Sequence, residues 1–387
     1  MSGPAKALEI KGMKNVERAS VVVTAAAAVM LSAYVGPVRA QLSAFPELDE
    51  AVATQLGAQL PAVPHAAAEA ARAGWSGWHE RQRDLRDTRS REDQSLPPGG
   101  GTWGLVYYGS ADHQASPGGV QSDYEQRRYG FSAGADLIAA RQWVVGVTTG
   151  YTRATVAFDQ LDTRADFDGV GVGFYASYFS ERVYLDAMLR QDWHKLDIEA
   201  PALGIQSEND QLSTDVDTTG LHIEGGMRWV QAEPAWGALR LDPLFNLSWV
   251  SVQADQLNIP PQDPLTNGLE GNRAHFDDYD SLRAAIGGRV SLVQAVGGAR
   301  LEHSLMLRYW HEFEREAGAE VALFDDDRMP VGEVTVADER GSGFADLGLG
   351  LVYSSATGGA SAMLKASAQT GSGYDSWNVT TGIRYLW

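Results

Sequence analysis

The sequence predicts an all-β chain: one antiparallel up-and-down transmembrane β-barrel of 12 strands, preceded by a short helical segment. Three observations support this fold class. Residues 101–387 contain 12 successive segments in which apolar and polar side chains alternate with a period of two, which is typical of strands. The connections between them alternate between short and long, and an export signal precedes them.

The first 40 residues have the layout of a secretory signal peptide. Lys11, Lys14 and Arg18 precede an uncharged run over residues 19–31, and small residues follow as far as Ala40. This layout predicts delivery to the Sec translocon and cleavage after Ala40. A membrane anchor is the alternative, but the run is short for a spanning helix of about 20 residues. Translation starts at Met1 or Met13, and the sequence leaves this choice open.

The 12 segments supply the barrel. In residues 301–313 one face carries Leu305, Leu307 and Tyr309, and the opposite face carries Glu302 and Arg308. We expect the strands to begin near residues 103, 125, 143, 166, 183, 214, 238, 274, 300, 341, 359 and 375. An even number places both ends of the barrel on the same side of the membrane.

The lengths of the connections agree with this arrangement. Short links are expected at residues 139–140, 180–181, 297–298 and 356–358, and residues 232–237 join the sixth and seventh strands. Residues 110–123, 197–213, 255–273 and 314–340 are expected to be long polar loops. Outer-membrane barrels keep short turns on one side and long loops on the other, whereas a soluble β-sandwich has no reason to do so.

Composition excludes several functions. The 387 residues include no cysteine, which rules out disulfides, thiolate metal sites and cysteine nucleophiles. A net charge of −19 argues against nucleic acid as a partner, because phosphate binding requires a basic face.

Several motifs, in their order along the chain, resemble a known family. They are Trp103-Gly104, Tyr129-Gly130-Phe131, Trp143 with Gly146 and Gly150-Tyr151, Asp242-Pro243-Leu244-Phe245, Arg308-Tyr309-Trp310-His311-Glu312-Phe313, Gly348-Leu349-Gly350-Leu351 and Gly382-Ile383-Arg384-Tyr385-Leu386-Trp387. Together they resemble the C-terminal translocator barrel of autotransporters, the proteins of type V secretion, over residues 101–387. One departure is the terminal Trp387, where the family more often has Phe.

The resemblance implies a monomeric barrel in the outer membrane of a Gram-negative bacterium, in contact with outer-membrane lipid. It also implies assembly by periplasmic chaperones and the barrel-assembly machinery. The expected assembly signal is the outward face of the last strand, formed by Val379, Ile383, Tyr385 and Trp387.

Residues 41–100 occupy the position of the family's secreted passenger, and we expect a very short or vestigial one. A helix is predicted over residues 66–91, and residues 97–101 form a hinge of Pro and Gly. In the family, a helix at this position passes through the lumen. We therefore expect a pore helix whose Arg72, Arg81, Arg83, Arg86 and Arg89 pair with Asp186, Glu224, Glu302 and Asp346. A solvated periplasmic helix is the alternative.

Charged residues of both signs are expected to line the lumen. They are Asp136, Asp186, Arg190, Asp192, Glu224, Arg228, Arg283, Arg289, Glu302, Arg308, Glu312, Asp346, Lys365 and Arg384. His194 with Asp192, and His222 with Glu224, resemble catalytic dyads. Each pair lies at i, i+2 on one strand, however, which favours polar filling of the lumen over catalysis.

We therefore expect no enzymatic activity, no cofactor and no metal site. The predicted function is that of a translocator barrel acting as conduit and surface anchor. The alternative is a porin-like channel, or a surface adhesin acting through its acidic extracellular loops.

Overall fold

The structure is a computed structural model. It describes residues 59, 62–75, 78, 82, 100–114, 122–159, 163–180, 182–199, 212–232, 237–259, 272–276, 278–316, 318–324, 330–337, 342–357 and 359–386. The predicted signal peptide, with its cleavage position at Ala40, lies outside these residues. No helix in the described part of the chain has the length and apolar character needed to cross a membrane.

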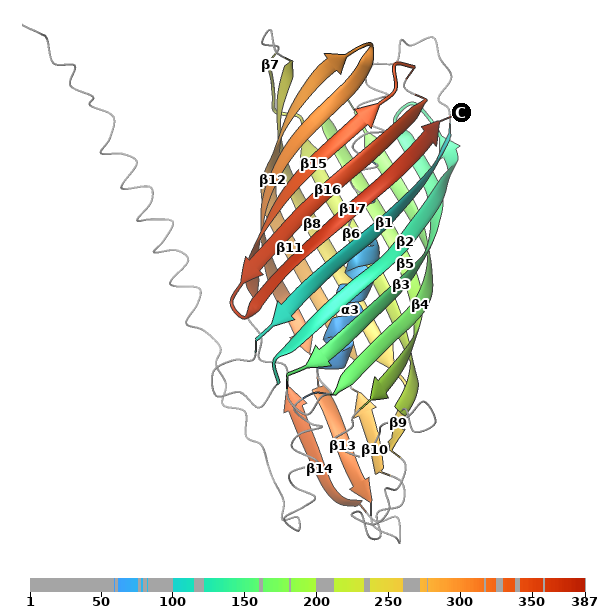
Figure 1. The fold of residues 1–387 in the computed structure, drawn as a ribbon, viewed down its shortest axis with the longest axis vertical. Coiled ribbons are helices and arrows are strands. Elements are labelled where there is room, and N and C mark those ends of the chain that lie inside the picture. The colour runs from blue at the N-terminus through green and yellow to red at the C-terminus, as the bar shows by residue number, and fades with distance from the viewer. Residues whose placement is uncertain are drawn as a thin grey trace, which may run out of the picture. The chain divides into compact units, whose positions relative to one another are not determined.

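Twelve long antiparallel strands form a closed barrel (Figure 1). They are β1 (Gly101–His113), β2 (Tyr124–Ala139), β3 (Trp143–Phe158), β4 (Arg164–Phe179), β5 (Val183–Glu199), β6 (Leu212–Met227), β8 (Ala238–Ala254), β11 (Tyr279–Val296), β12 (Ala299–Glu316), β15 (Gly343–Ser354), β16 (Ala360–Gly371) and β17 (Tyr374–Leu386). Consecutive barrel strands are neighbours, and β1 pairs with β17 to close the sheet. The predicted fold class is confirmed.

The barrel begins and ends at the same rim. Gly101 of β1 lies opposite Leu386 of β17, whereas His113 lies opposite Tyr374 at the other rim. We call the first rim the terminal end and the second the far end. At the terminal end, Gly297 and Gly298 join β11 to β12 with φ of 59° and 84°. Two consecutive left-handed residues form a tight hairpin turn whose twist suits the flanking strands.

A second sheet lies at the far end, where the sequence predicted mainly loops (Figure 1). It consists of β9 (Leu257–Ile259), β10 (Asn272–Phe276), β13 (Gly318–Phe324) and β14 (Pro330–Ala337), in the order β14-β13-β10-β9. The prediction of long loops over residues 255–273 and 314–340 was therefore wrong in part. The strand expected from about residue 274 is divided into β10 and β11, of which only β11 belongs to the barrel. Strand segments beyond the barrel rim still carry backbone donors and acceptors, and these pair with one another.

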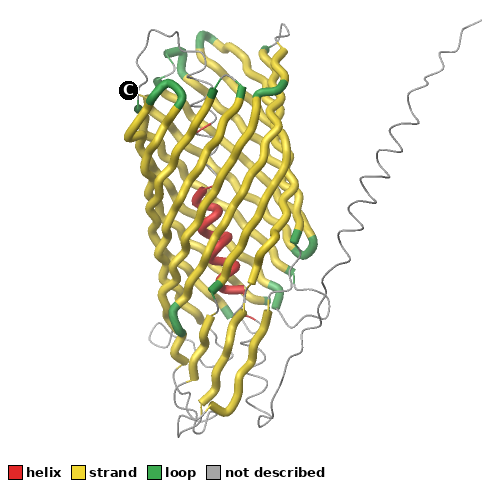
Figure 2. Tube along the Cα trace, turned by 180° about the vertical axis from the view of Figure 1, so that it is seen from behind, coloured by secondary structure: helices red, strands yellow, loops and turns green. Residues whose placement is uncertain are grey.

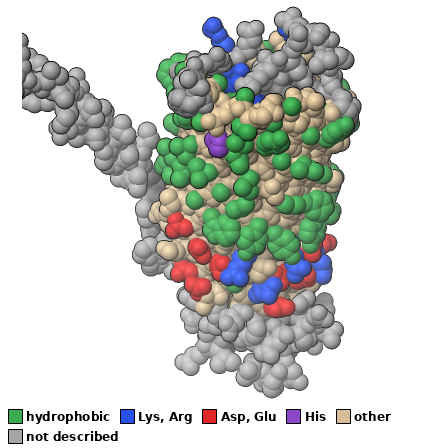
Figure 3. Space-filling model, turned by 45° about the horizontal axis from the view of Figure 1, so that its top comes forward, with side chains coloured by type: hydrophobic (Ala, Val, Ile, Leu, Met, Phe, Trp, Pro, Cys, Tyr) green, Lys and Arg blue, Asp and Glu red, His purple; other side chains and the backbone are tan. Residues whose placement is uncertain are grey.

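The strands place apolar side chains outside and polar side chains inside. Figure 3 shows apolar side chains spread over the outer wall, with acidic and basic side chains gathered toward one rim. The most exposed apolar side chains include Phe174, Leu307, Ile286 and Ile383. Buried residues of the barrel interior include many Asp, Glu, Arg, Ser and Thr side chains. A soluble barrel would have the opposite pattern, so this surface is suited to lipid.

A helix lies inside the barrel (Figures 1 and 2). This helix, α3 (Ala62–Trp75), contacts β2, β3, β6, β8 and β11. Its sequence contains seven alanines, the best helix-forming residue, and Pro64 falls in the first turn, where proline is tolerated. The prediction placed the start of the helix at Ala66, one turn later than observed. Gln59, Trp78 and Gln82 are also helical and buried.

Candidate functional site: the lumen and its helix

The lumen helix is narrow enough to fit because its side chains are small. Ala66, Ala67, Ala68, Ala70 and Ala71 are almost completely buried. The barrel wall also binds the helix backbone directly: Gln126 donates from Nε2 to the carbonyl oxygen of Ala66 at 2.7 Å, and the Ser132 hydroxyl donates to that of Gly74 at 3.1 Å. Because buried carbonyl groups need hydrogen-bond donors, these contacts favour one position of the helix along the lumen.

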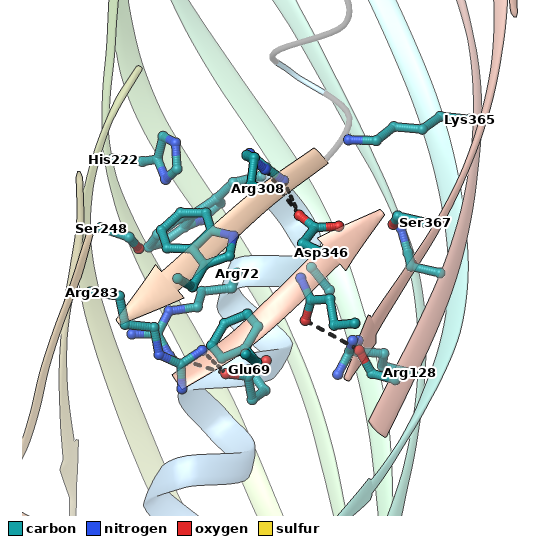
Figure 4. A pocket seen from close by; sticks show the side chains of 17 residues that line it. Glu69, Arg72, Arg128, His222, Ser248, Arg283, Arg308, Asp346, Lys365 and Ser367 are labelled. Carbon is teal, nitrogen blue, oxygen red and sulfur yellow. Dashed lines mark hydrogen bonds and ion pairs between the residues drawn. The ribbon is translucent and has the colours of Figure 1, made fainter. Parts of the chain in front are cut away.

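The centre of the site is Glu69, a buried carboxylate on the helix (Figure 4). Its Oε1 atom accepts from Nη1 of Arg283 at 2.5 Å and from Nη1 of Arg72 at 3.2 Å. The Tyr374 hydroxyl donates to Oε2 at 3.4 Å. Two guanidinium groups thus surround one carboxylate, a combination that compensates for the cost of burying charge.

The same network continues into the wall of the barrel. Nε of Arg283 lies 3.1 Å from Oε1 of Glu312, and the Ser281 hydroxyl donates to that carboxylate as well. Nη2 of Arg72 donates to the Ser281 hydroxyl oxygen at 2.6 Å. The helix is therefore joined to β11 and β12 through one connected set of charge-assisted hydrogen bonds.

Aromatic rings hold the beginning of the helix near the far end. Nδ1 of His65 lies 2.9 Å from the Tyr124 hydroxyl oxygen, within hydrogen-bond distance. The His113 ring stacks on Tyr124 with centroids 4.3 Å apart and meets the edge of His65 at 4.9 Å. His113 ends β1 and Tyr124 begins β2, so these rings belong to the far rim.

Other rings hold the end of the helix nearer the terminal end. The Trp75 ring fits against Gly220 of β6, where a Cβ atom would come within 2.0 Å of the ring. Trp78 packs against Tyr175 with centroids 5.9 Å apart. The Tyr175 hydroxyl donates to Asp136 at 2.8 Å, and Trp103 at the start of β1 donates to that hydroxyl at 3.2 Å. The helix therefore runs from the far end toward the terminal end.

The structure buries most of the charged residues that we assigned to the lumen. The buried ones are Asp136, Asp186, Arg190, Asp192, Glu224, Arg283, Arg289, Glu302, Arg308, Glu312, Asp346, Lys365 and Arg384. Arg228 is the exception: it lies in the connection after β6, where its backbone N–H donates to the carbonyl of Arg182 at 2.8 Å. Arg228 is only half-buried, and it follows the last residue of β6, Met227.

We expected five arginines of the helix to pair with wall carboxylates such as Asp186, Glu224, Glu302 and Asp346. Of these arginines the structure describes Arg72, which binds Glu69 of its own helix and Ser281 of the wall instead. The described part of the helix also supplies a carboxylate, Glu69, to Arg283 of the wall. Sequence reasoning missed Glu69, although it is the single acidic residue among residues 62–75. Arg81, Arg83, Arg86 and Arg89 lie outside the described residues.

The two histidine pairs lack the arrangement of a catalytic dyad. Asp192 binds Arg190 at 2.8 Å, with both side chains almost fully buried, and this pairing occupies the carboxylate next to His194. Glu224 accepts from the Tyr184 hydroxyl at 3.1 Å and from Asn246 at 2.9 Å. Among the described residues, no group of three or more His, Asp or Glu side chains is placed to hold a metal ion.

The outward face of the last strand is exposed at three of the four predicted positions. Val379, Ile383 and Tyr385 are exposed and apolar, and they alternate with buried Thr380 and Arg384. Trp387 lies outside the described residues.

A closed 12-stranded barrel with an apolar outer wall, a polar lumen and a helix in that lumen defines an outer-membrane β-barrel of the translocator type. The family model of the autotransporter β-domain matches residues 102–367. The chain therefore belongs to the autotransporter β-domain family, and its barrel is an outer-membrane translocator domain.

Solved structures share this fold at low sequence identity. The transport unit of the autotransporter AIDA-I from Escherichia coli has a TM-score of 0.56 at 14% identity, covering 77% of this chain and 92% of that one. The β-domain of the Bordetella autotransporter BrkA has a TM-score of 0.54 at 18% identity, covering 74% and 99%. The translocator domain of NalP from Neisseria meningitidis has a TM-score of 0.51 at 13% identity, covering 81% and 97%. A comparison of the sequence with curated proteins found no match.

Proposed function

We propose that this barrel presents the residues that precede α3 on the cell surface and anchors them there through the lumen helix. The observation that carries the proposal is the direction of α3. Its beginning contacts His113 and Tyr124 at the far rim, and Trp78, which follows it, contacts Tyr175 near the terminal end. This direction supports the proposal that the chain before Gln59 leads out of the lumen at the far end.

The two rims differ in a way that supports an assignment of their sides of the membrane. Outer-membrane barrels have short turns on the periplasmic side and longer loops outside. The terminal end has the two-residue turn at Gly297 and Gly298, and the far end has the second sheet, with β13 and β14. In the proposal, the far end is extracellular, and residues 41–58 are displayed there as a short passenger.

The lumen helix acts as the anchor because its contacts are numerous and buried. The Glu69–Arg283 pair, the Gln126 and Ser132 hydrogen bonds and the Trp75–Gly220 fit all oppose sliding of the helix. A helix in this position also reduces the open cross-section, which disfavours the porin-like alternative. We propose no catalytic role for the barrel, since its buried charged groups serve to hold the helix.

Delivery and assembly complete the proposal. The predicted signal peptide directs the chain to the Sec translocon and is removed after Ala40. Periplasmic chaperones and the barrel-assembly machinery then recognise the apolar outer face of the last strand. The barrel works as a monomer, because closure of β1 on β17 leaves its sheet without an edge that must pair with another copy.

Cysteine labelling of intact cells tests the proposal. The chain has no native cysteine, so single substitutions give a clean background. Ala53→Cys should react with a membrane-impermeant maleimide on intact cells, as should Asp278→Cys at the far end. Ala356→Cys, in the turn between β15 and β16, should react only after the cells are broken. Labelling of Ala53→Cys only in broken cells would contradict surface display.

A further inference from the structure

Beside the lumen helix lies a cavity of about 100 Å³, and its lining is strongly cationic (Figure 4). Five of the side chains that line it are basic: Arg72, Arg128, Arg283, Arg308 and Lys365. Two lining residues, Glu69 and Asp346, are carboxylates. Glu312, which is not part of the lining, also pairs with Arg283, so the described carboxylates Glu69, Glu312 and Asp346 pair with Arg72, Arg283 and Arg308.

The excess positive charge is clearest at Arg128 of β2. Its side chain is 95% buried, since only 5% of the residue is exposed. Arg72 and Arg283 share Glu69, and Arg308 pairs with Asp346. Arg128 forms no ion pair among the described residues, and its hydrogen bond there is to the neutral amide of Gln126 at 3.4 Å. A guanidinium buried without a carboxylate is costly, so this position favours an anion.

Hydrogen-bond donors around the cavity also outnumber their acceptors. The lining includes buried donor atoms that have no acceptor among the described residues: Nε of Arg72, Nε1 of Trp75, Nε of Arg128, Oγ of Ser248 and Nε1 of Trp310. Buried donors are normally satisfied. These side chains come from α3, β2, β8 and β12, so an acceptor in the cavity would be approached from several directions.

We propose that this cavity is a binding site for a small inorganic oxyanion of the phosphate or sulfate class. Such an ion carries several acceptor oxygens on one centre, which suits donors converging from different elements, and guanidinium groups bind these oxygens well. One water requires roughly 10–15 Å³ of such space, so the cavity has room for about seven to ten waters, which is enough for the one central atom and the oxygens of such an ion. The helix contributes Arg72 and Trp75, so the site exists only while α3 is in the lumen. The proposed anion site does not depend on the proposed display of residues 41–58 at the cell surface.

Titration of the purified full-length barrel in a non-ionic detergent tests the site. Sodium sulfate and sodium phosphate are titrated calorimetrically, with sodium chloride keeping the ionic strength constant. Wild type should bind one oxyanion saturably, and the oxyanion should raise the temperature at which the barrel unfolds on gels. Chloride at the same ionic strength should produce neither effect.

Two variants and one matched control give the test its specificity. Arg128→Gln should weaken oxyanion binding at least about tenfold, because it removes the cation that lacks a carboxylate. Arg127→Gln is the control. The Arg127 side chain, next to Arg128 in the sequence, points outward and pairs with Glu125 at 2.8 Å. Oxyanion binding by this variant should therefore stay within about twofold of wild type. Trp310→Phe keeps an aromatic side chain but removes the indole N–H donor, and it should weaken binding about fivefold.

Three results would overturn the proposal. The first is a wild-type protein that shows no saturable oxyanion binding beyond the effect of chloride. The second is an Arg128→Gln variant that binds as tightly as wild type. If Arg128→Gln does not fold, unchanged binding by Trp310→Phe is decisive against the site.

Discussion

Glu69 of the lumen helix and Arg283 of β11 form a buried ion pair, with Oε1 and Nη1 2.5 Å apart, between residues separated by 214 positions in the chain. The pair joins an element that precedes the barrel to the middle of the barrel wall. Removing one partner leaves the other charge buried, which is more damaging than the loss of an ordinary surface pair.

We predict that Glu69→Ala loosens the helix. The change should lower stability by about 3 kcal/mol, at the low end for a broken buried pair because Glu312 still faces Arg283. The unfolding temperature on unboiled gels should fall, and ion conduction in planar bilayers should rise. Glu125→Ala is the control, because its pair with Arg127 is solvent-exposed and should contribute little to stability. Equal effects of the two substitutions would show that Glu69 does not hold the helix.

A second prediction concerns the contact between Trp75 and Gly220. A Cβ atom at position 220 would come within 2.0 Å of the Trp75 ring, so Gly220→Ala should displace the ring at a cost of about 1–3 kcal/mol. Gly288→Ala on β11 is the matched control, because a Cβ atom at position 288 would lie 3.8 Å from its nearest neighbour, the carbonyl oxygen of Asp242. Gly220→Ala combined with Trp75→Ala should be less harmful than the sum of the single changes. Additive effects in that double-mutant cycle would refute the contact.

Much of the barrel could be predicted from the sequence because its two faces have different solvents. Alternation fixes the inner and outer face at each strand position, so Leu307 outside and Arg308 inside follow from spacing alone. The same reasoning ended too early at the far rim, where residues 314–340 looked polar and were assigned to a loop. In this region β13 pairs with both β10 and β14 through the backbone. The alternation of apolar and polar side chains does not reveal such pairing.

The lumen contacts were harder to predict, for a different physical reason. Alternation shows that Arg283 points inward, but not which charge on the helix it meets. That choice depends on the rotation and depth of α3, which Trp75 at Gly220 and Gln126 at Ala66 help to set. Arg72 was expected to pair with a wall carboxylate, but it binds Glu69 of its own helix. Glu69, the one carboxylate among residues 62–75, also meets the buried Arg283 of the wall, a pair that residue spacing does not reveal.

Removal of residues 41–98 tests the role of the helix as a plug, and this is the third prediction. The truncated barrel should still insert, since its strands are intact, but it should conduct ions more strongly because a polar lumen fills with water. The difference in conduction between the two barrels should become smaller at high salt if charge pairs hold the helix, because screening weakens such pairs. Equal conduction by the truncated and full-length barrels would mean that the helix does not restrict the lumen.

The last prediction concerns the outward face of β17. Ile383 is 71% exposed and alternates with buried Arg384, so it should contact lipid and belong to the surface that the assembly machinery reads. Ile383→Asp should strongly reduce assembly, and the protein should accumulate in the periplasm and be degraded. A charge on the lipid face at mid-bilayer costs about 2–4 kcal/mol for Arg or Lys and less for Asp, so impaired recognition should exceed the folding defect. Deleting Trp387 should have a similar effect, whereas Ile383→Leu should assemble normally. Outer-membrane levels of Ile383→Asp that match those of Ile383→Leu would refute the role of this face in assembly.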